Sequence, residues 1–196
     1  IYFVNPCPAE TAPTLKHTNV LLVIVDDLGF ADLSCLGSDD MQTPNLDQLY
    51  SDSLKLERLY ANCPVCSPTR ASVLTGCYPD RVGVPGVIRT HPENNWGYYQ
   101  PFTQTLPHQL QENGYETVAI GKWHLGLSPE THPLSQGFER FQGYLGDMMD
   151  DYYKHRRHGI NYRRDDRKEI DPKGHATDLF TQWAVDYING HAQQSK

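Results

Sequence analysis

A cysteine, a proline and an arginine stand close together in residues 66–70, which read Cys-Ser-Pro-Thr-Arg. Pro68 fixes its own φ and has no backbone N–H, so it suits the first turn of a helix, and Gly76 can end that helix. Cys66 is then expected just ahead of a helix N-terminus, where unpaired N–H groups favour an anion, and Arg70 adds positive charge. The pattern predicts a nucleophile facing an anionic substrate. The alternative is a buried structural cysteine beside an ordinary helix.

Two carboxylates, Asp26 and Asp27, follow a continuous apolar run at residues 19–25. The run predicts a strand covered on both faces, and ligands gather at the carboxyl ends of such strands. Neighbouring strand residues point to opposite faces, so the chain must bend if both carboxylates are to reach one site. Carboxylate oxygens favour calcium or magnesium. A solvated Asp-Asp turn without a metal is the other interpretation.

Two further polar side chains, Lys122 and His124, follow a β-favouring segment at residues 115–120. Being two residues apart, they point the same way on an extended chain. Both can donate hydrogen bonds to an oxyanion. A surface lysine and a structurally satisfied histidine are the alternative.

Other elements are predicted from local patterns. Helices are expected at residues 43–54, with Thr43 as N-cap, at 105–113, with Thr105 as N-cap, and at 177–189, where the pattern is amphipathic. A short strand is expected at 54–60. The order of these elements favours an α/β layered domain.

Residues 66–76 and 121–126 together resemble two motifs of the type I, formylglycine-dependent sulfatases. The first fits C-x-P-x-R with its usual continuation, and the second reads Gly-Lys-Trp-His-Leu-Gly. Segments at 43–47 and 136–144 also resemble this arylsulfatase-like family of the alkaline-phosphatase superfamily. The resemblance implies an α/β, alkaline-phosphatase-like layered sandwich with a mixed, mostly parallel sheet between helices. It also implies hydrolysis of sulfate monoesters on a sulfated saccharide or aryl alcohol.

The resemblance further implies a role for each candidate residue. In this family a maturation enzyme oxidises the cysteine at the position of Cys66 to formylglycine, whose hydrate attacks sulfur with one hydroxyl and expels sulfate after the other loses its proton. Asp26, Asp27 and the modified Cys66 would hold one calcium ion. Arg70 would anchor the formylglycine, and Lys122 and His124 would bind the sulfate and the hydrate.

The extent of the chain bears on these expectations. Residues 1–18 are predicted to be an extended lead-in and 19–196 the N-terminal part of a sulfatase catalytic domain. The family's later Asp-Asn pair and later His and Lys have no match before Lys196, so this chain alone is expected to be inactive. No apolar run is long enough to span a membrane, and we find no signal peptide in the chain. The resemblance implies a periplasmic, secreted or lysosome-like compartment.

Composition narrows the class of partner. The formal charge is −7, which argues against nucleic acid binding. The expected partners are a sulfated small molecule or glycan and the formylglycine-generating maturation enzyme. In the loop at 78–102, Arg89, His91, Trp96 and Tyr98 either touch a sugar or pack within the loop. The charge-rich run at 154–168 either steers a polyanion or is a solvated loop balanced by Asp165 and Asp166.

The sequence also allows two other functions, and a redox role for two of its cysteines. Some phosphatases and phosphonate or phosphodiester hydrolases of the same superfamily share the C-x-P-x-R nucleophile. A non-catalytic protein that binds sulfated glycans through an unmodified Cys66 is the second alternative. Of the five cysteines, Cys63 and Cys66 also have the spacing of a redox pair, and the pairing of the others does not follow from the sequence.

Overall fold

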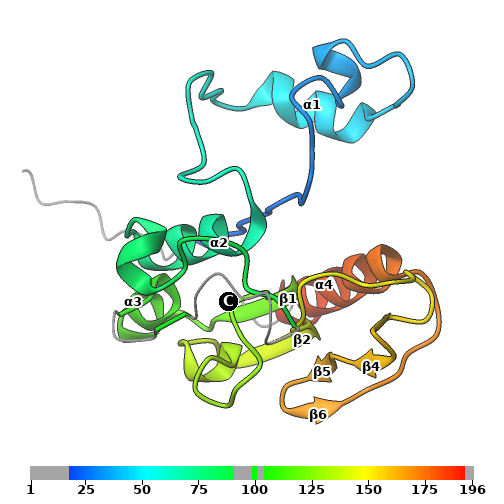
Figure 1. Ribbon diagram of the computed structural model, residues 1–196. Coiled ribbons are helices and arrows are strands. Elements are labelled where there is room, and N and C mark those ends of the chain that lie inside the picture. Colours follow the sequence, from blue (N-terminus) through cyan, green and yellow to red (C-terminus); the bar gives the residue numbers. More distant parts are fainter. Residues whose placement is uncertain (1–17, 91–98, 101–103, 193–196) are drawn as a thin grey trace, which may run out of the picture. The chain divides into compact units, whose positions relative to one another are not determined.

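The computed structural model describes residues 18–90, 99–100 and 104–192. The chain divides into two compact units, residues 1–56 and 57–196, and each is described by itself (Figure 1). Apart from Thr18, the expected lead-in lies outside the described residues, as do Cys7, His91, Trp96 and Tyr98. No helix in the described part of the chain is long and apolar enough to cross a membrane.

The first unit contains a short 3-10 helix, η1 (Ser34–Leu36), and a helix, α1 (Pro44–Asp52). Thr43 is the N-cap residue of α1 and Pro44 its first residue, as the sequence predicts. Asp47 accepts hydrogen bonds from the hydroxyls of Ser34 (2.5 Å) and Thr43 (2.7 Å), which tie η1 to α1. These two hydrogen bonds stabilise the carboxylate and lower the pKa of Asp47 to about 2.

Two predicted strands are wrong. The segments at 19–25 and 54–60 contain no strand in the structure. The side chains from Val20 to Val25 are between 42% and 73% exposed rather than covered on both faces. β-branched residues favour extended backbone, but a strand also needs a neighbour that pairs with its N–H and C=O groups. Residues 18–56 contain no strand that provides such a partner.

The second unit contains a mixed sheet with helices around it (Figure 1). In the sheet, strand order is β1-β2-β5-β6; β1 and β2 are parallel, whereas the β2–β5 and β5–β6 pairs are antiparallel. A separate hairpin pairs β3 with β4. The elements are α2 (Cys66–Thr75), η2 (Pro79–Val82), α3 (Leu106–Glu112), β1 (Val118–Lys122), η4 (Pro133–Ser135), β2 (Arg140–Tyr144), β3 (Arg156–Arg157), β4 (Ile160–Asn161), β5 (Arg163–Asp165), β6 (Lys168–Glu169) and α4 (Ala176–Ala192).

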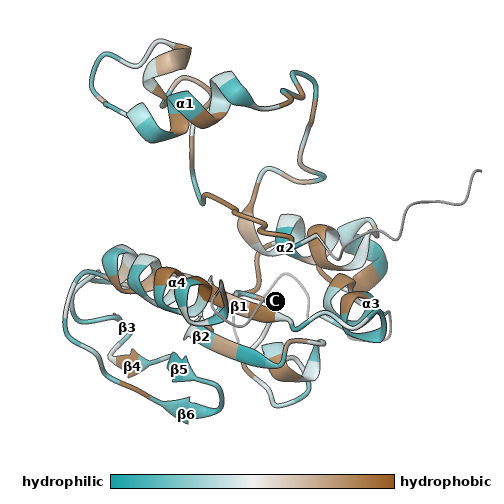
Figure 2. Cartoon of the chain, turned by 180° about the vertical axis from the view of Figure 1, so that it is seen from behind, coloured by the Kyte–Doolittle hydropathy of each residue, from teal (hydrophilic) through white to brown (hydrophobic). Residues whose placement is uncertain are grey.

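Two predicted helices of this unit are confirmed. Helix α3 begins after Thr105, whose hydroxyl and backbone N–H both bond to His108 in a capping box. Helix α4 packs against β1 and β2, and Figure 2 shows hydrophilic and hydrophobic residues intermingled along it. The Arg163 guanidinium is fully buried beneath α4, 4.6 Å from the ring centroid of Phe180 and 5.3 Å from that of Trp183. The negative ring faces stabilise this buried cation.

The hydrophobic core of the second unit joins α2, η2, β1 and β2. Its residues come from segments far apart in the sequence, so burial of their apolar surface holds the start of α2 near the end of β1. The buried members of this cluster are Ala71, Val82, Val84, Ile88, Tyr99, Trp123, Leu125, Phe141 and Leu145.

The parallel pairing of β1 with β2 depends on Gly143, which lies opposite Gly121. A Cβ atom at Gly143 would lie 2.0 Å from the backbone carbonyl oxygen of Gly121. We expect Gly143→Ala to lower the free energy of unfolding by at least about 2 kcal/mol, because backbone atoms of β1 or β2 must move. Urea unfolding measures the change.

Gly190→Ala in α4 is the matched control for that substitution. Apart from its chain neighbours and the backbone of α4 itself, no atom of the described residues lies within 4 Å of a Cβ at Gly190, so alanine there should stabilise the helix by about 0.5–1 kcal/mol. Equal stability of the Gly143→Ala variant and the wild type would contradict the close approach of β1 and β2.

The charge-rich run at 154–168 forms the short strands β3 to β5 and the start of β6, so it is not a solvated loop. Its charges pair with neighbouring polar groups, which argues against a surface that steers a polyanion. The acids that balance it are not the predicted ones, because Asp165 and Asp166 pair with Arg140 on β2. The contacts of the run are Arg156 with Asp171, Arg157 with Asp147 and Asp150, Arg164 with Glu169, and Arg167 with Ser135.

Candidate active site

Cys66 is the first residue of helix α2, one position further into the helix than the sequence analysis expects. Val65 before it is extended (φ −133°, ψ 159°), and Pro68 lies in the first turn. Gly76 ends the helix in the left-handed conformation (φ 66°), where its N–H bonds to the carbonyl of Ser72. Half-buried Cys66 therefore lies among the unpaired N–H groups of a helix start, a position that favours negative charge.

Arg70 connects the two sequence motifs. It lies one turn into α2, and its Nη1 donates a 2.7 Å hydrogen bond to the backbone carbonyl of Lys122, the last residue of β1. The bond spans 52 residues of sequence. Residues 66–70 and 121–126, which only a resemblance connects in the sequence, thus meet in one part of the second unit.

His124 lies just beyond β1, with only 3% of its surface exposed. Its Nε2 lies 2.6 Å from the carbonyl oxygen of Ile88. Because a carbonyl oxygen only accepts hydrogen bonds, Nε2 carries the hydrogen and Nδ1 keeps a lone pair. Nδ1 is buried and has no hydrogen-bond partner among the described residues. It is therefore an acceptor available to a bound group.

The surroundings of His124 hold it neutral. Burial lowers its pKa to about 4, and the positive charges of Lys122 and Arg70 act in the same direction. The hydrogen bond to Ile88 and the charge of Asp147 oppose the shift but do not outweigh it. At neutral pH the imidazole can therefore accept a proton.

This lowered pKa predicts a pH dependence of stability. In the unfolded chain a histidine titrates near pH 6.5, whereas folded His124 titrates near pH 4. The unfolded state therefore binds the extra proton first, and the free energy of unfolding falls as the pH drops from about 6.5 to about 4, by up to about 3 kcal/mol. His124→Gln, which keeps a donor toward Ile88 but does not titrate here, should lose less stability over this window. Urea unfolding at pH 7 and pH 5 compares the two proteins; equal losses would contradict a neutral His124.

Two residues that the sequence analysis did not select, Ser67 and Ile88, connect α2 with His124. The Ser67 hydroxyl accepts a 3.0 Å hydrogen bond from the Ile88 N–H, and the Ile88 carbonyl accepts the bond from His124. Ile88 acts through its backbone, so its side-chain type carries no signal of this role. Ser67 lies inside the recognised motif at a position that the motif leaves variable.

Asp26 and Asp27 belong to the first unit, at a turn directly after the apolar run. Asp27 has φ 59°, so the backbone bends at this residue. Two neighbouring carboxylates need such a bend if both are to bind the same metal ion. Carboxylate oxygens suit calcium, which takes six to eight oxygen ligands. The described residues contain no group of three or more His, Cys, Asp or Glu that could hold a metal. The two aspartates fit a calcium site in donor type.

The described cysteines Cys35, Cys63, Cys66 and Cys77 are all free thiols. Cys63 and Cys66 are therefore not joined as an oxidised redox pair. The carbonyl of Cys63 instead accepts a 2.6 Å hydrogen bond from the Thr69 hydroxyl, which holds the segment that enters α2.

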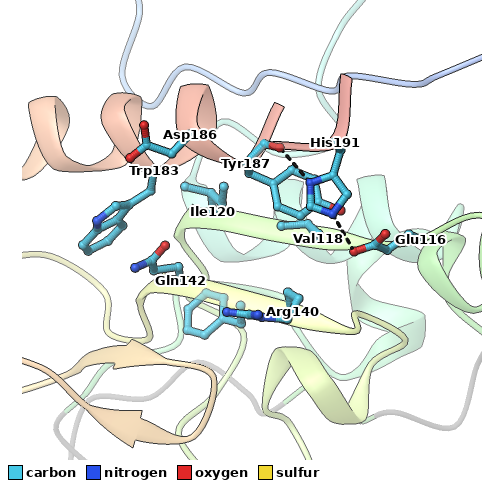
Figure 3. Close-up of a pocket in the computed structure, with 10 residues that line it drawn as sticks. Glu116, Val118, Ile120, Arg140, Gln142, Trp183, Asp186, Tyr187 and His191 are labelled. Atoms are coloured by element: carbon cyan, nitrogen blue, oxygen red, sulfur yellow. Dashed lines mark hydrogen bonds and ion pairs between the residues drawn. The ribbon is translucent and has the colours of Figure 1, made fainter. Parts of the chain in front are cut away.

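A hollow of about 330 Å³ lies between α4 and the strands β1 and β2 (Figure 3). The Nε2 of His191 lies 3.3 Å from Oε1 of Glu116, and its Nδ1 hydrogen-bonds to the Tyr187 carbonyl at 2.8 Å. None of the six predicted site residues lines this hollow.

Comparisons with known proteins agree with the two motifs. The family model described as Sulfatase matches residues 18–196. The chain is 41% identical over 148 residues to mouse (Mus musculus) steryl-sulfatase, covering 71% of this chain and 23% of that protein. It is 33% identical over 202 residues to human (Homo sapiens) N-acetylgalactosamine-6-sulfatase, covering 94% of this chain and 38% of that protein. The chain thus spans less than two fifths of the length of these relatives.

Solved structures show the same likeness. The crystal structure of Ps i-CgsB in complex with k-i-k-neocarrahexaose matches with a TM-score of 0.73 at 30% identity, covering 84% of this chain and 40% of that one. The structure of BT4656 in complex with its substrate D-glucosamine-2-N,6-O-disulfate matches with a TM-score of 0.65 at 30% identity, covering 84% and 29%. The α/β fold with a mixed sheet agrees with these neighbours. The chain belongs to the type I sulfatase family of the alkaline-phosphatase superfamily.

Proposed function

We propose that the complete protein hydrolyses sulfate monoesters with residue 66, in its formylglycine form, as the nucleophile. The observation that carries this proposal is the Arg70 hydrogen bond to the Lys122 carbonyl, which brings the cysteine motif and the Lys-x-His motif together. A nucleophile at a helix start, two cations and a neutral imidazole are groups suited to the hydrolysis of an anionic ester.

Each residue has a distinct task in this proposal. The hydrated aldehyde of formylglycine supplies one hydroxyl for attack on sulfur and a second whose deprotonation lets sulfate leave. Arg70 and Lys122 offset the negative charge of the ester near the start of α2. His124, with Nε2 held by Ile88, offers Nδ1 to accept a proton. Its low pKa keeps that nitrogen unprotonated at neutral pH.

Calcium is the proposed metal, with Asp26 and Asp27 among its ligands. When bound, such an ion would offset the charge of the sulfate group and of the nucleophile. The two aspartates contribute hard oxygen donors on a bent backbone. Residues 19–196 are then the N-terminal part of the sulfatase catalytic domain.

The proposed substrate is a sulfated saccharide or a sulfated aryl alcohol. Relatives named for N-acetylgalactosamine-6-sulfate, and a neighbour solved with a disulfated glucosamine, favour the saccharide. The relative named steryl-sulfatase instead favours an alcohol that is not a saccharide. We further propose a periplasmic, secreted or lysosome-like location and a formylglycine-generating maturation enzyme as a partner.

The test compares ester classes on the complete protein, produced with a formylglycine-generating enzyme. We expect turnover of an aryl sulfate with kcat/KM well above that for the matching aryl phosphate. Preference for the phosphate would indicate a phosphatase or phosphodiester hydrolase of the same superfamily. Binding of sulfated saccharides without turnover of either ester, together with an intact Cys66 thiol, would indicate a glycan-binding protein.

A further inference from the structure

Backbone hydrogen bonds hold Ile88 from two sides. Its N–H donates to the Oγ of Ser67 at 3.0 Å, and its carbonyl accepts from Nε2 of His124 at 2.6 Å. All three residues are buried, with exposed fractions of 0% for Ser67, 6% for Ile88 and 3% for His124. Water therefore does not compete for either hydrogen bond, and the position of each group depends on the other two.

These two hydrogen bonds form a short path, Ser67–Ile88–His124, between the neighbour of the proposed nucleophile, residue 66, and the proposed base, His124. Ser67 is the neighbour of Cys66 in the first turn of α2, so its hydroxyl moves with the start of that helix. The Ile88 N–H and carbonyl flank a single Cα atom. Fixing the N–H therefore restricts where the carbonyl points, and the carbonyl selects the tautomer and the ring orientation of His124.

We propose that Ser67 is a positioning residue of this site, which holds the Ile88 backbone so that its carbonyl keeps the His124 ring in place with Nδ1 as the free acceptor. The catalytic consequence rests on the proposed function. The hydrogen-bonded path itself does not, because it is observed between described residues of one compact unit.

Ser72 shows that burial of a serine on α2 is not enough for this role. It lies on the same helix and is 8% exposed, yet its hydroxyl has no hydrogen-bond partner among the described residues. Ser72→Ala therefore removes a buried hydroxyl from α2 without breaking a side-chain hydrogen bond. It is the matched control for Ser67→Ala.

The activity test uses the complete protein made with the maturation enzyme. Rates are divided by the fraction of residue 66 converted to formylglycine, because Ser67 lies inside the maturation motif. We expect Ser67→Ala to lower kcat by about 10- to 100-fold with KM changed by less than about threefold, because the base is displaced while sulfate binding persists. Ser72→Ala should stay within about threefold of wild type. Ser67→Thr, which keeps an acceptor oxygen, should recover most of the lost kcat.

Hydrogen exchange at the Ile88 amide tests the path without any turnover. Ser67→Ala should speed this exchange by at least about tenfold, whereas Ser72→Ala should leave it unchanged. Unchanged exchange in Ser67→Ala, or equal kcat values for Ser67→Ala and Ser72→Ala in an active enzyme, would overturn the proposal. A wild-type protein that hydrolyses no sulfate ester, but whose Ile88 exchange responds to Ser67→Ala, would refute the proposed function and still support the Ser67 path.

Discussion

Replacing Cys66 with alanine is expected to lower kcat for sulfate ester hydrolysis by at least about 10⁴-fold, because the variant has no nucleophile and no group that can become formylglycine. The fold should persist, since Cys66 is only half-buried and alanine is favourable in the first turn of α2. Steady-state kinetics on the complete protein, with circular dichroism to check folding, measures the effect.

Cys63→Ser provides the control for that substitution. Cys63 lies three residues before Cys66, is also a free thiol, and takes part in the entry to α2 through its backbone carbonyl. Serine keeps that carbonyl, so activity should stay within about threefold of wild type. If Cys63→Ser lost as much activity as Cys66→Ala, or if Cys66→Ala stayed active, the nucleophile would be assigned to the wrong residue.

Loss of the metal is the second large effect that we expect. Asp26→Ala and Asp27→Ala should each lower kcat/KM by about 10³-fold, which corresponds to about 4 kcal/mol of transition-state stabilisation. Removing calcium from the wild-type protein with a chelator should cause a loss of similar size that added calcium reverses. Equilibrium dialysis should show one calcium ion bound per wild-type chain and none in either variant.

Asp39→Ala is the control for the metal prediction. Asp39 is an exposed aspartate in the same unit, so its removal changes the charge by the same amount without touching the Asp-Asp turn. Calcium binding and activity should be preserved. If Asp26→Ala and Asp27→Ala still bound one calcium ion per chain, the assignment of these two residues as metal ligands would be wrong.

Local signals in the sequence predict helices well in this protein. Helix α2 contains Pro68 in its first turn and ends at Gly76, where a left-handed residue is needed. Thr105 caps α3, and the apolar periodicity of residues 177–189 predicts α4, which packs against β1 and β2. These signals lie within a few residues of the helix that they specify, so they do not depend on the rest of the fold.

Strands and contacts between distant residues are harder to predict from the sequence of this protein. Residues 19–25 have the composition of a buried strand, but the described part of their unit offers no pairing partner. The Arg70 bond to Lys122 and the Ser67 bond to Ile88 involve backbone groups 52 and 21 residues away. Backbone N–H and C=O groups occur at nearly every position, so the sequence does not mark which of them meet a given side chain. The family resemblance supplied the pairing of the two motifs, whereas the role of Ile88 came from the structure.

The most direct test measures the chemical state of residue 66 and the turnover of an aryl sulfate in the same preparations. The complete protein is produced with graded amounts of the maturation enzyme, and mass spectrometry of the peptide containing residue 66 gives the fraction converted to formylglycine. We predict that kcat rises in proportion to that fraction and extrapolates to zero for the unmodified thiol. Sulfate ester hydrolysis by a preparation in which Cys66 remains an intact thiol would contradict the account.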